Sequence, residues 1–213
     1  MTAEKTTLND AIVTTFDSLL SAVHTSLPGR IEKYDYKKQQ AEVKPLVKKK
    51  FIDGEVMELP VLVNVPVVFP RTKKSGITFP LATGDGVLLI FAERSLERWY
   101  STGEDSEPGD RRKFDMSDAI AIPGCFSFAN DNLASNNDDL EIHHNGFKIV
   151  IKKNGNIQLL GTGGTDLVKV LDDWMTQMIS TKVITGIGLQ PFDPTSLLAM
   201  TQIQLELKKL LAV

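Results

Sequence analysis

Hydrophobic positions recur every three or four residues near the start of the chain. The apolar residues of 7–25 line one helical face, with Asn9, Asp17, Ser18 and Ser21 opposite. They are Leu8, Ile12, Phe16, Leu19, Leu20 and Val23. The pattern predicts an amphipathic helix that ends before Leu27-Pro28-Gly29, because proline disfavours helical geometry at the residue before it. Its apolar stripe must cover either the domain that follows or a neighbouring chain, and the sequence leaves both open.

The pattern then changes to short strand signals that continue to Gly124. Residues 30–34 and 40–44 alternate between polar and apolar, whereas 59–70 and 84–91 are nearly continuous apolar runs typical of buried strands. Short strands separated by Gly, Pro and Asp favour a small closed antiparallel barrel over a sandwich. Pro66 and Pro70 cannot donate ladder hydrogen bonds, so residues 65–69 are expected at an edge or rim.

A third pattern begins after a stretch rich in Asn, Asp and Ser. From 139 to 161 the residues alternate with period two, and Asn145-Gly146 and Asn154-Gly155 predict turns. Lys148, Val150 and Lys152 are expected to face outward. The opposite face should be apolar, and three such strands have too little core to stand alone. The predicted apolar face, which we take as a self-association surface, is Phe147, Ile149, Ile151, Ile157 and Leu159.

Helical spacing returns in the last third. One helix is predicted from Asp166 to about Lys182, and a second begins at the N-cap Asp193 with Pro194 in its first position and runs to Ala212. Residues 186–191 would join them as a loop. This helical hairpin has more apolar surface than two helices can hide from water, which argues for self-association.

Composition excludes several classes of protein. The chain has 213 residues, 42% apolar and 24% charged, which is ordinary for a globular protein. A net charge of -3 gives no general attraction for nucleic acid. The single Cys125 excludes an intramolecular disulfide and is expected to pack as a small hydrophobe. The chain shows no long apolar run and no leader pattern at its start. We therefore predict that it is made as a soluble protein in the cytoplasm.

No arrangement of residues predicts catalysis. Residues 161–164, Gly-Thr-Gly-Gly, lack the lysine of a phosphate-binding loop. Glu104, Asp105 and Glu107 lie in a polar loop without an apolar wall to separate their pKa values, as a glycosidase pair would need. We therefore predict a protein that is not an enzyme and has no cofactor.

An ordered series of motifs gives a more specific indication. The motifs are Pro28-Gly29-Arg30-Ile31, Ala41-Glu42-Val43-Lys44-Pro45-Leu46, the apolar runs 59–70 and 84–91, Arg98-Trp99-Tyr100, Gly103, residues 108–112 (Pro-Gly-Asp-Arg-Arg) and residues 118–124 (Asp-Ala-Ile-Ala-Ile-Pro-Gly). In this order they resemble the N-terminal OB-fold domain of the membrane-puncturing central spike proteins of contractile-tailed bacteriophages, and are similar to baseplate assembly protein V. The resemblance covers roughly residues 27–124.

The resemblance implies a mainly β fold with added helices. We expect an N-terminal amphipathic helix over 1–26, an antiparallel OB-fold barrel over 27–128, a linker over 129–139, a short intertwined trimeric β segment over 140–163 and a C-terminal helical hairpin over 164–213. In phage spikes, short β segments of three chains wind together into a β-prism or triple-stranded β-helix. Residues 140–163 look like an abbreviated version.

The same resemblance implies a mechanical function in a virion. The expected protein is a homotrimeric central spike, or a spike-to-hub adaptor, in the tail baseplate, where its OB domain docks on the baseplate hub. Sheath contraction would drive it into the host envelope, which it contacts only on injection. Longer members of the family end in a pointed β-helix, whereas this chain ends in helices. A separate spike-tip protein is therefore expected as a further partner.

Three groups of residues remain as candidates for binding. Arg98, Trp99 and Tyr100 could anchor a partner, although a Trp that caps the mouth of the barrel is equally compatible with the sequence. His143 and His144 are weak metal candidates. Related spikes hold iron in rings of His-x-His, but adjacent strand residues point to opposite faces, so three chains would supply three ligands instead of six. Ordinary strand polarity is expected, and no metal.

Two alternative functions stay open. Lys48-Lys49-Lys50 with Lys44 is a basic cluster, and OB folds often bind single-stranded nucleic acid through basic grooves with aromatic platforms. The aromatic residues nearby form no regular series, so nucleic acid is not expected as a partner. The second alternative is a tail-associated hydrolase.

Overall fold

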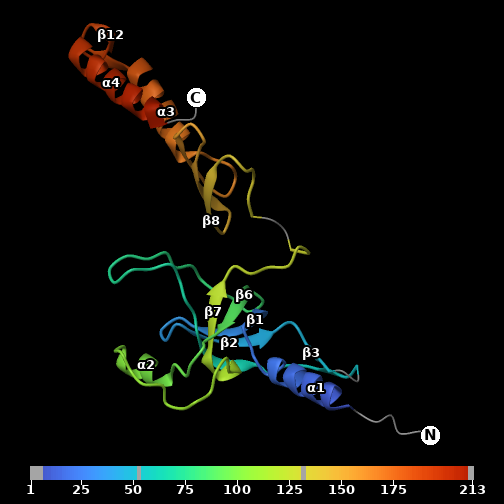
Figure 1. Ribbon diagram of the computed structural model, residues 1–213. Helices are drawn as coiled ribbons and strands as arrows, with labels where there is room; N and C mark the ends of the chain where they lie inside the picture. Colours follow the sequence, from blue (N-terminus) through green and yellow to red (C-terminus); the bar gives the residue numbers. More distant parts are fainter. Residues whose placement is uncertain (1–6, 52–53, 131–132, 211–213) are drawn as a thin grey trace. The chain divides into compact units, whose positions relative to one another are not determined.

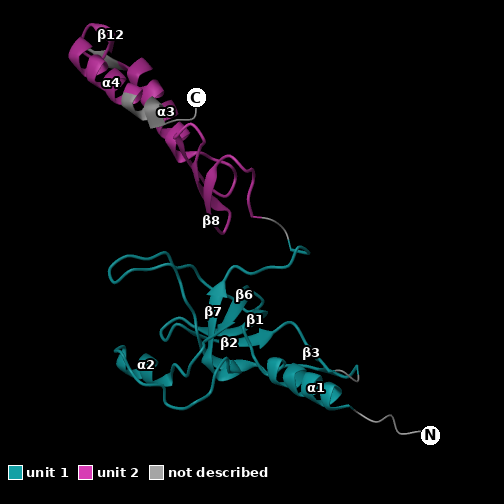
Figure 2. Cartoon of the chain, viewed as in Figure 1, with its two compact units in different colours: residues 1–130 teal, residues 131–213 magenta. Residues whose placement is uncertain are grey.

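The computed structural model describes residues 7–51, 54–130 and 133–210. It divides into two compact units, residues 1–130 and residues 131–213 (Figure 2). Unit 1 combines an N-terminal helix with a curled antiparallel sheet, and unit 2 combines a small sheet with helices (Figure 1). The predicted fold class, mainly β with helices at both ends, is confirmed.

The first helix, α1 (Leu8–Leu20), begins at a capping box. The Asp10 amide donates to Thr7 Oγ1 at 3.2 Å, and the Thr7 amide donates to Asp10 Oδ2 at 2.9 Å, so two backbone groups that the helix leaves unpaired are satisfied. None of the residues in α1 is buried, and the predicted apolar stripe lies at the surface.

Five strands of unit 1 form one curled antiparallel sheet in the order β5-β2-β1-β6-β7. They are β1 (Ser26–Asp35), β2 (Gln40–Pro45), β5 (Leu62–Pro66), β6 (Gly86–Phe91) and β7 (Ala119–Pro123), and a side ribbon pairs β3 (Lys49–Lys50) with β4 (Val56–Met57). The edges meet just beyond β5, where Val67 bridges Ala121 in parallel and the Val68 amide donates to the Ala121 carbonyl at 2.9 Å. This contact brings the two edges of the curled sheet together, in the manner of a five-stranded OB-fold barrel.

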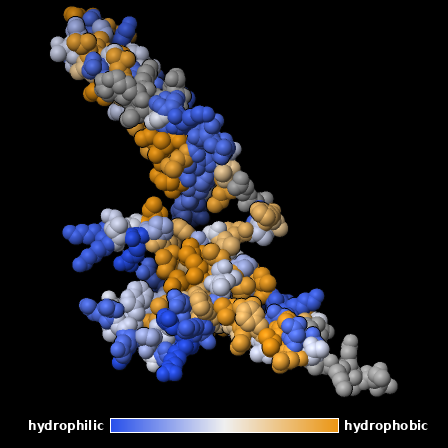
Figure 3. Space-filling model, viewed as in Figure 1, coloured by the Kyte–Doolittle hydropathy of each residue, from blue (hydrophilic) through white to orange (hydrophobic). Residues whose placement is uncertain are grey.

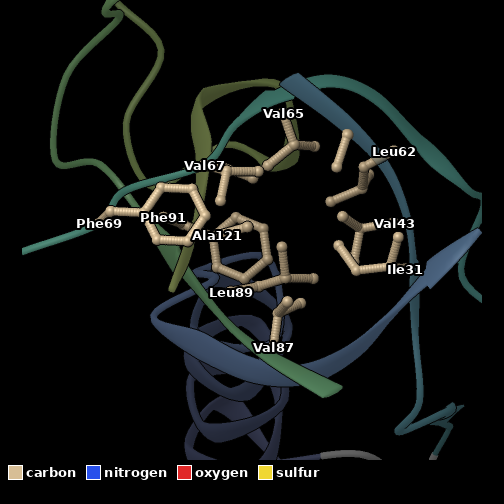
Figure 4. Packing of buried hydrophobic residues seen from close by; sticks show 12 residues of the cluster. Ile31, Val43, Leu62, Val65, Val67, Phe69, Val87, Leu89, Phe91 and Ala121 are labelled. Atoms are coloured by element: carbon tan, nitrogen blue, oxygen red, sulfur yellow. The ribbon is translucent and has the colours of Figure 1, made fainter. Parts of the chain in front are cut away.

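The core of unit 1 lies inside this barrel. Ile31, Val43, Val87 and Leu89 are its largest fully buried side chains, and Figure 4 shows them turned toward the residues of the other strands. Gly29 is required at the start of this packing, because a Cβ there would lie 2.7 Å from Val43 Cγ1. The barrel therefore buries its own apolar face without a partner.

The connection between β6 and β7 contains helical turns besides the polar loop that the sequence predicts around Glu104. It contains α2 (Glu97–Thr102), which ends at Gly103 in the left-handed region, and the 3-10 helix η1 (Met116–Asp118). Buried Asp118 holds this connection together. Its carboxylate accepts from Arg112 Nε at 2.6 Å, from Arg112 Nη2 at 3.1 Å and from the Leu96 amide at 2.9 Å.

Unit 2 begins with a three-stranded antiparallel sheet in the order β10-β9-β8, whose turns lie at the two predicted Asn-Gly pairs. Asp166 then caps α3 through the Val168 amide, and the Asp193 carboxylate caps α4 through the Thr195 and Ser196 amides. The elements are β8 (Leu140–His144), β9 (Phe147–Ile151), β10 (Ile157–Leu160), α3 (Leu167–Ser180), β11 (Lys182–Thr185), β12 (Gly188–Pro191) and α4 (Pro194–Leu210).

The prediction of a loop over residues 186–191 is wrong. The two helices are joined by the antiparallel ribbon β11–β12, in which Val183 pairs with Gln190. Residues 181–185 are mostly β-branched, which favours an extended backbone over a helix. The predicted end of the second helix at Ala212 lies outside the described residues. Within the described part of the chain, no helix is both long enough and apolar enough to span a membrane.

The Asp118 contacts predict a specific loss of stability. Arg112→Met should lower the free energy of unfolding of the chain by about 3 kcal/mol, because it leaves the buried carboxylate without its cation. The matched control Arg111→Met, at an exposed neighbour, should change it by no more than about 0.5 kcal/mol. Urea unfolding of the intact chain measures both, and equal stability of the two variants would show that the ion pair does not organise this connection.

Candidate interaction surfaces

The register of the small sheet places its apolar residues on one face. Ile149 of β9 pairs directly with Ile142 of β8 and with Leu159 of β10. Directly paired residues share a face, and so do residues two apart along a strand. We call this the apolar sheet face, and its members are Leu140, Ile142, His144, Phe147, Ile149, Ile151, Ile157 and Leu159.

The apolar sheet face is open to solvent in the single chain. Leu140 is 59% exposed and Phe147 is 41% exposed. In the view of Figure 3, apolar side chains gather on one flank of the β8–β10 region of unit 2, and hydrophilic side chains gather on the other flank. All five residues predicted for self-association lie on the apolar sheet face. The sequence prediction omitted the residues of β8, although the alternation in 140–144 is the signal that would have found them.

The opposite face of the same sheet is polar but covered. The Ser135 amide donates to Glu141 Oε2 at 3.0 Å, and Lys148 Nζ donates to Ser135 Oγ at 2.6 Å. Val150 lies between Glu141 and Gln158 in the register and is only 2% exposed. The expectation that Lys148 and Val150 face outward is therefore wrong: Val150 is buried and Lys148 is half-buried. The physical reason is that the segment around Ser135 folds back and bonds to this face.

Local contacts lower the pKa of two carboxyl groups near this covered face. The Ser135 amide, with smaller contributions from the Ser135 hydroxyl and His143, holds the pKa of Glu141 below its ordinary value. The Lys152 ammonium, whose Nζ lies 3.1 Å from Asp139 Oδ2, does the same for the pKa of Asp139, helped by Asn136 and the Lys153 amide. Both groups are therefore held as carboxylates at neutral pH.

In this sheet the covered side is thus the opposite of the side that a monomeric sheet needs to cover. An antiparallel sheet with one wet face normally packs its apolar side on a core and leaves its polar side to water. Here the polar side carries the cover, and the apolar side is mostly exposed, with Ile149, Ile157 and Leu159 half-buried. A contiguous exposed apolar surface of this kind is typical of a protein interface.

The two candidate metal ligands lie on opposite faces of the sheet, as strand geometry predicts. His143 is on the covered face, and its Nε2 lies 2.9 Å from Glu141 Oε2. His144 is on the apolar sheet face, where it pairs directly with Phe147. Over the residues that the structure describes, no three His, Cys, Asp or Glu side chains gather in a way that could hold a metal ion.

The predicted aromatic anchor lies on α2. Trp99 is half exposed and stands outside the buried cluster, with its ring centroid 5.1 Å from that of Tyr100. Partial burial, and then the charge of Asp118, raise the pKa of Tyr100 above its ordinary value. Because the Asp118 contacts fix the segment around α2, this aromatic pair is held on an ordered part of the barrel surface.

The basic cluster is partly neutralised within unit 1. Glu58 lies 2.8 Å from Lys48 Nζ and 3.4 Å from Lys44 Nζ, and these contacts, that with Lys48 first, lower the pKa of Glu58. Lys49 Nζ lies 5.4 Å from the centre of the Phe51 ring. An OB groove that binds a nucleic-acid backbone needs unpaired positive charge along it, and Glu58 lowers the charge that this cluster offers.

Comparison with known proteins bears on unit 1. Residues 27–124 match the family model described as the phage protein Gp138 N-terminal domain. Over these residues the chain is therefore similar to a domain of bacteriophage proteins. The matched range holds nearly all of the OB-fold barrel, covers slightly less than half of the chain and ends before unit 2. The match supports the bacteriophage part of the resemblance and a structural role in a virion. No curated protein matches the chain.

The lowered pKa values predict how unit 2 responds to acid. A carboxyl group whose pKa is lower in the folded state adds stability above its unfolded pKa, about 4 for Asp and Glu, and that stability is lost as the pH falls through the folded pKa. The double variant Asp139→Asn/Glu141→Gln should therefore have a lower melting temperature than the wild type at pH 7, and the difference should shrink toward pH 3. Calorimetry of the intact chain measures it. The control Asp105→Asn, in an exposed loop of the other unit, should follow the wild type, and a pH-independent difference in the double variant would contradict the account.

Proposed function

We propose that this protein is a homotrimeric structural component of a phage tail baseplate, either the central spike or the adaptor between the hub and a separate spike-tip protein. The phage domain in unit 1 supports the virion context. The observation that carries the proposal is the largely exposed apolar sheet face of unit 2, where Phe147 and Ile151 are exposed and Ile149 is half-buried along the central strand.

Self-association would remove this face from water. Fully burying one Leu, Ile or Phe side chain contributes about 1.5–3 kcal/mol, so the residues of the apolar sheet face together can offset the loss of freedom when chains associate. A trimer is proposed because short β segments of three chains wind around one axis in the phage spikes that the sequence resembles. Two sheets packed face to face would also cover the surface, and the mass of the assembly distinguishes the two arrangements.

The two units would divide the work. The OB-fold barrel closes its own core, so its outer surface is available for docking on the hub, and we propose that Arg98, Trp99 and Tyr100 of α2 take part in that contact. Unit 2 would hold three copies together and transmit force along the tail axis during injection. This role needs no catalytic group and no cofactor, and the host envelope would be met only at that moment.

A charge placed on the apolar sheet face tests the proposal. Ile149→Asp puts one carboxylate per chain at the centre of the face, and each buried unpaired charge costs several kcal/mol. We expect the wild type to have a mass of about 70 kDa, three times the 23.5 kDa of one chain, and the variant to be monomeric. Multi-angle light scattering at micromolar concentration measures both.

The matched control introduces the same residue at the hairpin tip of the same sheet. Asn154→Asp preserves an oxygen that can accept from the Asn156 amide, as Asn154 Oδ1 does at 3.1 Å, and lies away from the apolar sheet face. It should assemble like the wild type. A monomeric wild type, or an Ile149→Asp variant that assembles as well as the control, would contradict the proposal.

A further inference from the structure

Helix α3 carries two apolar stripes, whereas packing against one other helix in a hairpin needs only one. The first stripe contains buried Val168 and half-buried Met175 and Ile179, and it lies on the side of α3 that packs within unit 2. On that side Gln204 of α4 donates to Asp172 Oδ1 at 2.7 Å and to Thr176 Oγ1 at 2.6 Å. These contacts fix which side of α3 meets α4.

The second stripe is largely exposed with respect to the residues of unit 2 that the structure describes. Its members follow one another at intervals of four, three and four, which is the spacing of a coiled-coil seam. Trp174 is 60% exposed, the two leucines are also exposed, and the methionine is half-buried. We call these residues the α3 seam: Leu167, Leu171, Trp174 and Met178.

Charges on α3 are kept away from this seam. Lys169 and Asp173 pair with each other at 3.0 Å, and by helical spacing they lie on the opposite side of the helix. The positions that border the seam are Val170, Met175 and Gln177, none of which is charged. Identical helices placed side by side must avoid bringing like charges together, and this distribution does so. A helix surface that binds a different, charged protein would not need uncharged residues along its borders.

We propose that the α3 seam packs against the same seam of the other copies of this chain, as a short parallel coiled coil. The parallel direction rests on the proposed threefold self-association through the apolar sheet face: α3 begins only a few residues after β10, and in a trimer wound along the direction of the chain the three copies of α3 run the same way. A coil of this length is marginal alone. It therefore reinforces the sheet contact and sets the register of the C-terminal hairpins.

Cysteine cross-linking of the full chain tests this geometry. In a Cys125→Ser background, Leu171→Cys and Met178→Cys each place a thiol on the seam, and Lys169→Cys places one on the opposite side of the helix. A disulfide requires Cα atoms about 4.4–6.8 Å apart, which identical seam positions approach only in a parallel, in-register pair. Mild oxidation should give a covalent dimer with the first two variants and none with the third, on a non-reducing gel.

Each other outcome overturns the inference in a distinguishable way. An intact oligomer that forms no dimer at positions 171 and 178 means that the seam is antiparallel, or is covered by another protein or a lipid surface, and leaves the proposed function standing. Cross-linking at all three positions means random collision. A monomeric wild type removes both the inference and the proposed function.

A second pair of variants measures the contribution of the seam without new thiols. Leu171→Gln/Trp174→Gln keeps good helix formers but removes apolar surface, so the concentration at which half of the chains are assembled should rise at least about tenfold. Lys169→Gln should leave it unchanged. Equal assembly of both variants in sedimentation experiments would contradict a seam between copies.

Discussion

The apolar face of the β8–β10 sheet is the constraint on which unit 2 depends, because most of its residues stay exposed among the described residues of that unit. A small sheet gains stability in water only when its apolar side packs on something. The segment that could have covered this side is already bonded to the other one, through Ser135, Glu141 and Lys148. These hydrogen bonds keep the segment over Val150, which is buried, so the apolar sheet face is left largely exposed in the single chain.

The two units solve the burial problem differently. Unit 1 curls its sheet until Val67 meets Ala121, and its apolar residues then face one another inside the barrel. Unit 2 has sheet and helices too small to enclose a core, and buried hydrophobic residues there are few within the part of the chain that the structure describes. This difference is what the proposed function rests on: unit 1 encloses its own core, and unit 2 leaves an apolar face that copies of the chain would cover.

Sequence patterns were sufficient where one local rule decides the structure. Continuous apolar runs and alternation gave the barrel strands, the Asn-Gly pairs gave the turns, and Asp166 and Asp193 gave the starts of α3 and α4. Helix α2 was missed because six residues are too few to show a helical period. The β11–β12 ribbon was missed because its glycines suggested a loop.

Features that depend on distant contacts could not be predicted. Aspartate is usually found at the protein surface, and only the contacts of Asp118 with Arg112 and Leu96 explain its burial. The same holds for Val150, whose position in an alternating strand indicates an outward face until the cover around Ser135 is seen. The apolar sheet face itself was predictable in part, because alternation fixes which residues share a face but not what covers it.

A cryo-electron microscopy reconstruction of the phage particle that carries this chain tests the central claim most directly. The account predicts three copies around the tail axis at the baseplate end, with Phe147, Ile149 and Ile151 turned toward that axis and away from solvent. A single copy, a position away from the tail end, or an apolar sheet face that stays open to water in the assembled particle would contradict it.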